Sequence, residues 1–336
     1  MTKKIASLSL DLDNLWSYMK THGDPGWQDF PGYLDIVVPR FLDMLQELSI
    51  SMTVFVVGQD AVLDQNKPIL KSIADAGHEI ANHSFNHEPW LHLYSASDIA
   101  EEIARAEDAI FLATGQRPIG FRGPGYSLSE AVLRVLTQRG YKYDCSTFPT
   151  IVGPLARAYY FARARLASDQ KQRRKALFGG VTDGFRPLSP YAWDLTEKQL
   201  IEIPVTTLPY GRVPIHFSYL HWIAGGSNRL ASAYFSAALR TCDFAGIAPS
   251  LLLHPLDFLG GDDVKELAFF PAMNQSSTEK LARMKRYLST LNDRYDVITM
   301  ASHAALLDTA DLPLRRPDFD TERQEKIESA HEDSVL

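Results

Sequence analysis

Residues 5–13 of this 336-residue chain read IASLSLDLD, an apolar run that ends in two carboxylates. The run predicts a buried β-strand over residues 5–12. Side chains alternate along a strand, so Asp11 and Asp13 point the same way. Two carboxylates in one pocket repel each other, which favours a shared proton or a bound cation. The alternative is a turn or a helix N-cap, where aspartate is common.

The rest of the chain alternates short apolar runs with helical stretches. Apolar residues recur every three or four positions in the expected helices, which are 34–48, 66–76, 96–114 and 129–138. The other expected strands are 52–58, 78–82, 119–122, 141–146, 200–206, 250–254 and 296–300. This alternation predicts an α/β fold, a distorted (β/α) barrel of seven or eight strands in a single domain. Catalytic residues of such barrels lie where the strands end.

Two regions interrupt the alternation. Residues 150–199 look like an insertion that can serve as a lid, and within them 155–175 carry seven Lys or Arg against one Asp. Residues 308–336 are polar and charged, and so little apolar surface cannot offset the entropy of ordering them. We therefore expect a barrel domain over 1–307 and a loosely ordered tail over 308–336.

The composition excludes several classes of protein. Hydrophobic residues make up 45% of the chain and charged residues 22%, as in an ordinary globular protein. The net charge of −7 argues against nucleic-acid binding. Cys145 and Cys242 are too few for a disulfide framework or a zinc finger. The N-terminus shows no secretory core and no run approaches the ~18 apolar residues of a spanning helix, so we expect a cytoplasmic protein without a transmembrane segment.

Residues 83–87 read HSFNH and follow the third expected strand. Histidines at i and i+4 lie on one face of a helical turn and can share a metal ion. Chance spacing among ten histidines is the alternative, but the strand-end position beside two carboxylates favours ligands. Two imidazoles and one carboxylate suit Zn²⁺ or a similar divalent ion and leave a position open for water.

Three more candidates stand at the ends of expected strands. Arg122, in FRGPG, can pair with a catalytic carboxylate and orient it, although a structural ion pair is the alternative. Asp144 lies in YDCS, and His254 abruptly ends the apolar run of LLLHP. A lone histidine in such a place is often a core residue. The coincidence of all these candidates with strand ends is the argument for a shared site.

The motifs SLDLD, HSFNH, FRGPG, YDCS and LLLHP, in this order, resemble those of the polysaccharide deacetylase family (carbohydrate esterase family 4, the NodB-homology domain). The resemblance covers about residues 5–150 and 200–305 and implies a (β/α) barrel with a single metal ion, usually zinc. It implies that Asp13, His83 and His87 are the metal ligands. It further implies the catalytic residues, with Asp11 as general base, Arg122 as its partner, His254 as general acid, and Asp144 orienting or tuning that histidine.

The chain departs from the family pattern in two motifs. Leu12 separates two aspartates that are adjacent in many members, as in a subgroup that acts on less usual substrates. The fourth motif normally includes a tryptophan that lines the acyl pocket, and here Thr147 and Phe148 lie in its place. We expect substrate contacts from Pro124, Tyr126, Phe148 and Trp222.

The resemblance implies a hydrolase that removes an N-acetyl or other N-acyl group from an amino sugar. The cofactor would be one divalent ion. Zinc is the first expectation, and cobalt, nickel, manganese and iron are the alternatives. Two alternatives stay open: C–N hydrolysis of a non-sugar amide or cyclic ureide on the same fold, and a catalytically silent carbohydrate-binding barrel. A silent barrel has no need of acid, base and metal together.

Basic and aromatic residues over 155–175 and 215–223 are compatible with a nucleotide- or lipid-linked biosynthetic intermediate and a peripheral membrane contact. A solvated helix packing on the barrel explains them equally well. A homo-oligomer is compatible with the sequence.

Overall fold

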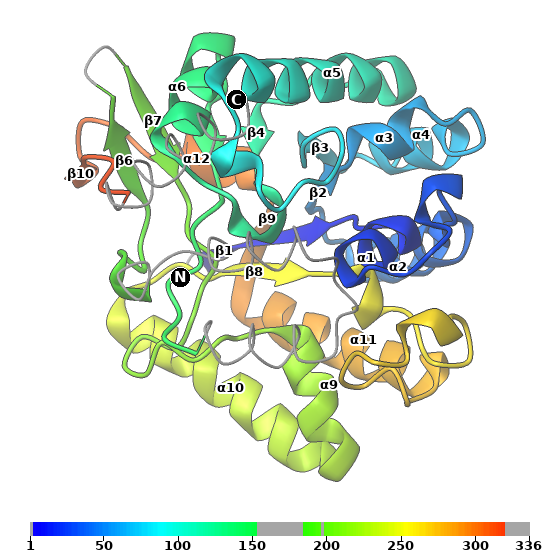
Figure 1. The fold of residues 1–336 in the computed structure, drawn as a ribbon. Coiled ribbons are helices and arrows are strands. Elements are labelled where there is room, and N and C mark those ends of the chain that lie inside the picture. Colours follow the sequence, from blue (N-terminus) through cyan, green and yellow to red (C-terminus); the bar gives the residue numbers. More distant parts are fainter. Residues whose placement is uncertain (1–2, 153–183, 196–197, 320–336) are drawn as a thin grey trace.

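The structure, a computed structural model, describes residues 3–152, 184–195 and 198–319. The strands of these residues form one ten-stranded sheet in the order β10-β6-β7-β5-β4-β3-β2-β1-β8, with β9 paired to β1 (Figure 1). The strands are β1 (Lys4–Asp11), β2 (Thr53–Val56), β3 (Glu79–Asn82), β4 (Gly120–Phe121), β5 (Tyr143–Asp144), β6 (Tyr191–Asp194), β7 (Gln199–Glu202), β8 (Ser250–Leu253), β9 (Tyr295–Ile298) and β10 (Leu314–Arg315).

Most of the helices pack outside the curved sheet (Figure 1). They are α1 (Leu15–His22), α2 (Leu34–Leu48), α3 (Gly58–Val62), α4 (Lys67–Asp75), α5 (Ala96–Thr114), α6 (Glu130–Arg139), α9 (Phe217–Gly226), α10 (Asn228–Ala245), α11 (Ser277–Arg294) and α12 (Met300–Ala305). Serine side chains cap several of them, and glycines in the left-handed conformation end α5, α6 and α10. Among the described residues, no helix has both the length and the hydropathy needed to cross a membrane.

Strand β1 is buried because it pairs in parallel with β8 on one edge and, on the other, with β9 along its first half and β2 along its second half. Its apolar side chains pack in the main core against the outer helices, and these are Ala6, Leu8 and Leu10. Ser9 and Asp11 alternate with them and therefore point into the barrel. The polar residues of β1 thus line the interior, where the candidate site lies.

The ladders of the sheet leave it open between β7 and β8. All its ladders are parallel except the one between β6 and β7. Within the part of the chain that the structure describes, no ladder joins β7 to β8. Instead, the backbone N–H of Thr206 donates to the carbonyl of Ser250 over 2.9 Å, and the N–H of Ser250 donates to Oγ1 of Thr206 over 2.7 Å. The predicted α/β fold with a curved, largely parallel sheet is confirmed, but the sheet has ten strands where seven or eight were expected, and it is not closed by a ladder at this seam.

Helix α12 fills the amino-terminal end of the barrel. Met300 packs in a second buried cluster with residues of β2, β3 and β5. The N–H of Ala301 donates to Oε2 of Glu79, and Nδ1 of His303 lies 2.9 Å from Oγ of Ser7. Because this end is filled, the open end is the one where the parallel strands finish.

Several elements match the sequence predictions, and two strands were missed. The predicted helices 34–48 and 96–114 coincide with α2 and α5. Strand β6 lies within 150–199 and pairs antiparallel with β7, and β10 lies within 308–336 and pairs with β6. The basic stretch 155–175 and residues 320–336 lie outside the described residues, so the lid and the tail remain predictions.

The close approach of β4 and β5 yields a first prediction. A Cβ built on Gly120 would lie 1.9 Å from Cζ of Tyr143, whose hydroxyl donates to Glu79 over 2.6 Å. We expect Gly120→Ala to lower the free energy of unfolding by about 1–3 kcal/mol, because the buried ring has to move. Gly226→Ala is the matched control, since nothing lies within 4 Å of its Cβ position. Equal urea midpoints for the two variants would contradict this packing.

A second prediction concerns acid stability. Burial lowers the pKa of His303 from 6.5 to about 4. The unfolded chain therefore takes up this proton first, and the contribution of His303 to stability falls as pH drops from about 6.5 towards 4. We expect the urea stability of His303→Gln to depend less on pH over this interval than that of the unmodified protein. Parallel curves of unfolding free energy against pH would show that His303 does not titrate there.

Candidate active site

The open end of the barrel gathers the polar residues predicted from the strand ends. Asp11 is the last residue of β1, and Asp13 follows two positions later. His83 comes directly after β3, Arg122 after β4 and His254 after β8. The four elements are neighbours in the sheet or face each other across the barrel, so residues far apart in sequence share one buried region.

Asp11 is held by a buried ion pair with Arg122. Nη1 of Arg122 donates to Oδ1 of Asp11 over 2.6 Å. Oδ2 of Asp11 lies 4.0 Å from Nε2 of His254. One carboxylate oxygen is therefore fixed by the arginine, while the other faces the histidine.

Arg122 is fully buried, and its donors are directed to several elements. Nε donates to the carbonyl of Cys145, and both terminal nitrogens donate to Oγ of Ser9, each over 3.1 Å. The guanidinium lies over the ring of Phe55 at 4.2 Å from the centroid. Burial lowers the pKa of Arg122, but the negative charge of Asp11 outweighs it and the net shift is upward. The group is therefore a permanent cation beside Asp11.

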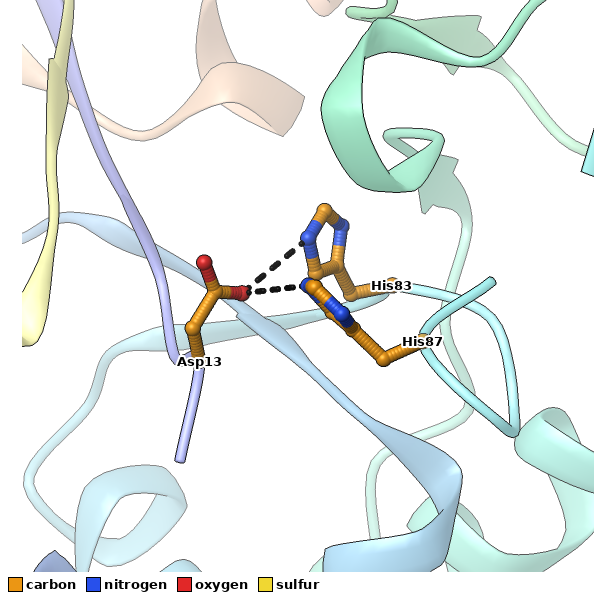
Figure 2. A group of neighbouring side chains, drawn as sticks. All are labelled: Asp13, His83 and His87. Atoms are coloured by element: carbon orange, nitrogen blue, oxygen red, sulfur yellow. Dashed lines mark ion pairs between the residues drawn. The ribbon is translucent and has the colours of Figure 1, made fainter. Parts of the chain in front are cut away.

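Asp13, His83 and His87 point toward one another (Figure 2). Nε2 of His87 lies 2.9 Å and Nε2 of His83 3.3 Å from Oδ1 of Asp13. One ligand atom from each residue lies within 4.8 Å of the other two, and all three residues are buried. These separations suit a single small cation with one oxygen and two imidazole ligands.

The hydrogen bonds of this cluster agree with a cation site. Nδ1 of His83 lies 2.7 Å from the carbonyl of Arg122, which can only accept, so Nδ1 carries the proton and a neutral ring has a lone pair at Nε2. Oδ1 of Asp13 is buried and receives no well-oriented hydrogen bond from a described residue. The residues present therefore fit a divalent metal ion.

The pKa shifts of Asp13 and His83 also agree with a cation site. Burial raises the pKa of Asp13, but the adjacent His87 and His83 outweigh it and hold the pKa well below its usual range. Burial lowers the pKa of His83, yet the carboxylates of Asp11 and Asp13 raise it overall. The two carboxylates thus attract positive charge into a buried pocket.

The loop 83–87 differs from the helical turn expected for its His-x3-His spacing. Ser84 and His87 adopt left-handed backbone angles, with φ of 60° and 48°. The carboxylate of Glu102, on α5, accepts the N–H groups of Phe85 and Asn86 and the side-chain amide of Asn86. The loop therefore depends on a buried acid from a neighbouring helix for the conformation that turns both histidines inward.

The Asp13 loop has a comparable support. Nδ2 of Asn14 and Nε1 of Trp16 both donate to Oδ1 of Asp60, over 2.7 and 3.0 Å. The Trp16 ring meets His87 edge to face, with centroids 6.5 Å apart. The hydroxyl of Tyr33 donates to the carbonyl of Asp13 over 2.5 Å. The backbone around Asp13 and the ring of His87 are thus supported by neighbouring side chains.

Asp144 belongs to one of the motifs that contribute to the site, but its hydrogen bonds are made to Ser146 and not to His254. Its carboxylate accepts from the hydroxyl and N–H of Ser146. Burial and the charge of Glu202, on β7, raise the pKa of Asp144 well above its usual range. Asp144 is therefore hydrogen-bonded within its own wall of the barrel. Among the described residues, His254 has no hydrogen-bond partner at Nδ1.

The four expected substrate contacts fall into two groups. Tyr126 stacks on Phe148, with ring centroids 4.8 Å apart, and Pro124 is buried at the start of the same short turn. Asp11 and Asp13 are among the charges that raise the pKa of Tyr126 after burial, which places its ring near the carboxylates. Trp222 is 65% exposed on α9. The described contacts do not join it to the catalytic group.

Sequence reasoning missed three supporting residues. Asp257 accepts the N–H of His254 over 2.8 Å, and its position three residues after a strand-end residue is a capping pattern that could have been noticed. Glu102 lies 16 residues from the loop that it holds, without a spacing signal. The ring of His216 stacks on His254 with centroids 4.9 Å apart, and nothing in its own motif marks it.

Comparisons with known proteins agree with this geometry. A sequence model of the family described as polysaccharide deacetylase matches residues 26–143, which include His83, His87 and Arg122. The peptidoglycan-N-acetylmuramic acid deacetylase PdaA of Bacillus subtilis is 34% identical over 112 residues, or 33% of this chain and 41% of that protein. A peptidoglycan deacetylase of Helicobacter pylori is 26% identical over 153 residues, or 44% of this chain and 50% of that protein.

The chain spans half or less of the length of these relatives. A solved structure from Mycobacterium smegmatis, assigned to the polysaccharide deacetylases, covers 94% of both chains with a TM-score of 0.62 at 20% identity, a likeness of fold. Residues 26–143 are thus similar to the polysaccharide deacetylase family, and the α/β fold of the whole chain is similar to that of a structure assigned to it.

Proposed function

We propose that this protein is a metal-dependent hydrolase that removes an N-acetyl or other N-acyl group from an amino sugar. One observation carries the proposal. Asp11 has one carboxylate oxygen bonded to Arg122 and the other 4.0 Å from His254. The same pocket contains the converging side chains of Asp13, His83 and His87. A base, an acid and a cation site in one pocket are what amide hydrolysis requires.

Asp13, His83 and His87 would hold the cofactor, one divalent ion. Zinc suits this ligand set best, and cobalt, nickel, manganese and iron accept similar ligands. When bound, the ion polarises the acyl carbonyl and lowers the pKa of the attacking water.

The proton transfers would fall to Asp11 and His254. Arg122 occupies Oδ1 of Asp11, so Oδ2 is the oxygen free to accept the proton of the attacking water. His254 would donate a proton from Nε2 to the departing amine, which is otherwise a poor leaving group. Asp144, hydrogen-bonded to Ser146, would act on the architecture of the wall rather than on this proton.

The substrate proposal rests on the rings at the mouth and on the relatives. Tyr126, Phe148 and Pro124 offer an apolar surface for an acyl methyl group or a sugar face, and exposed Trp222 would meet a more distant part. By their names, one relative deacetylates the N-acetylmuramic acid of peptidoglycan and the other deacetylates peptidoglycan. We extend the proposal to a biosynthetic, nucleotide- or lipid-linked sugar in the cytoplasm, where the buried free thiols Cys145 and Cys242 are stable.

The metal site yields the third prediction. The purified protein, dialysed against trace zinc, should hold about one ion per chain by elemental analysis. Asp13→Ala, His83→Ala and His87→Ala should each lose most of it, whereas His303→Gln, a buried histidine outside the cluster, should keep it. Full zinc occupancy in the His83→Ala, His87→Ala double variant would refute the assignment.

The fourth prediction separates acid from base. Asp11→Asn should reduce turnover of an acetamido sugar by about 10²–10⁴-fold while the metal content stays unchanged, because the three ligands remain. His254→Ala should reduce amide hydrolysis by about 10²-fold or more but affect an activated acetate ester far less, because a good leaving group departs without a proton.

Equal losses on amide and ester would exclude His254 as the acid. Wild-type turnover of a cyclic ureide without turnover of any acetamido sugar would instead favour the alternative C–N hydrolase. A metal-loaded protein that hydrolyses neither class but binds glycans would favour the silent barrel.

A further inference from the structure

The backbone of His254 is fixed from two sides. Its N–H donates to Oδ2 of Asp257 over 2.8 Å, and Oδ1 of Asp257 accepts the hydroxyl of Ser218 over 2.9 Å. Ser218 lies in the first turn of α9. The main chain of the proposed acid is therefore tied to the start of this helix.

The imidazole ring of His254 is not fixed by strong hydrogen bonds as its backbone is. The His254 side chain faces the backbone N–H of Asp257 in a capping box, but its buried Nδ1 makes no well-oriented hydrogen bond to a described residue. Asp144, which the family resemblance assigns to this task, bonds to Ser146. Packing on the ring therefore helps to determine where Nε2 points, and one aromatic residue stacks on it.

That residue is His216. The two imidazoles are stacked, with centroids 4.9 Å apart and an interplanar angle of 29°. His216 is the N-cap of α9, and its Nδ1 accepts the N–H of Ser218 over 3.3 Å. A nitrogen that accepts carries a lone pair, so the neutral ring bears its proton at Nε2. The tautomer and orientation of His216 are thus set by the helix.

The charge state of His216 suits this contact. Burial and the neighbouring His254 lower the pKa of His216 to about 3, while Asp11 acts weakly in the opposite direction. The ring therefore stays neutral at ordinary pH. A neutral face can stack on a protonated imidazole, whereas two imidazolium ions at this distance would repel each other.

We propose that His216 is the positioning residue of the general acid: its helix-locked ring holds the His254 imidazole with Nε2 directed toward Asp11 and the leaving nitrogen. The inference rests on the proposed function and adds a residue outside the five motifs. In this chain, stacking contributes orientation that a carboxylate at Nδ1 would otherwise provide.

The test compares two substitutions on two substrates. His216→Ala removes the stacked ring and should lower kcat for an acetamido sugar at least about tenfold, with a much smaller effect on an activated acetate ester. His216→Phe keeps a flat ring and should restore amide kcat to within about threefold of wild type. Ser227→Ala, which removes the N-cap of α10 instead, is the matched control and should leave both rates unchanged.

A double variant makes the comparison sharper. In a His254→Ala background, His216→Ala should cause no further loss, because the residue acts through the acid. Equal slowing of amide and ester by His216→Ala, or a full additional loss in the double variant, would overturn the proposal and make His216 merely structural.

A spectroscopic arm does not depend on activity. In protein labelled with ¹⁵N-histidine, His216 should show the neutral Nε2–H tautomer from pH 5 to 8, assigned by its loss in His216→Phe. The ring signals of His254 should shift in His216→Ala but not in Ser227→Ala. An Nδ1–H tautomer of His216, or His254 signals that do not shift in His216→Ala, would overturn the inference. If the spectra are as expected but the wild-type protein hydrolyses no substrate, only the proposed function would be contradicted.

Discussion

The buried ion pair between Arg122 and Asp11 organises the entire open end of the barrel. One guanidinium joins β1 through Ser9 and Asp11, the segment after β5 through the carbonyl of Cys145, and β2 through the ring of Phe55. The backbone carbonyl of Arg122 accepts Nδ1–H of His83 and so fixes the tautomer of a proposed ligand. Removing one partner of such a pair leaves an unpaired buried charge and costs about 3–5 kcal/mol. The orientation of Asp11, the tautomer of His83 and the packing of the strands therefore depend on the same residue.

The sequence predicted the barrel and the strand-end residues because both follow from local patterns. Apolar periodicity marked α2 and α5, and strand alternation put Asp11 and Asp13 on the same side. Strands β6 and β10 escaped prediction because they are four and two residues long and owe their conformation to pairing across the sheet. Short strands without a periodic signal depend on partners that are distant in sequence.

The parts of the site that were wrong or missed share this cause. The His-x3-His spacing was correctly noticed, but a loop with two left-handed residues brings the histidines together where a helical turn was expected. The acid that holds this loop, Glu102, comes from a helix farther along the chain. The contacts of Asp144 and His216 depend on how β5 and α9 pack, which spacing cannot reveal.

Among the described strands, the edge of the sheet between β7 and β8 is the most sparsely hydrogen-bonded join. Tyr126 and Phe148 belong to the β4 and β5 wall, while His216 and His254 stand on α9 and after β8, across the join between Thr206 and Ser250. Two hydrogen bonds between Thr206 and Ser250 hold this join, against a four-residue ladder between β1 and β8. The residues proposed as acid, base and metal ligands therefore stand beside the densely bonded edge of the sheet, and the rings of Tyr126 and Phe148 stand on the other side of its most sparsely bonded join.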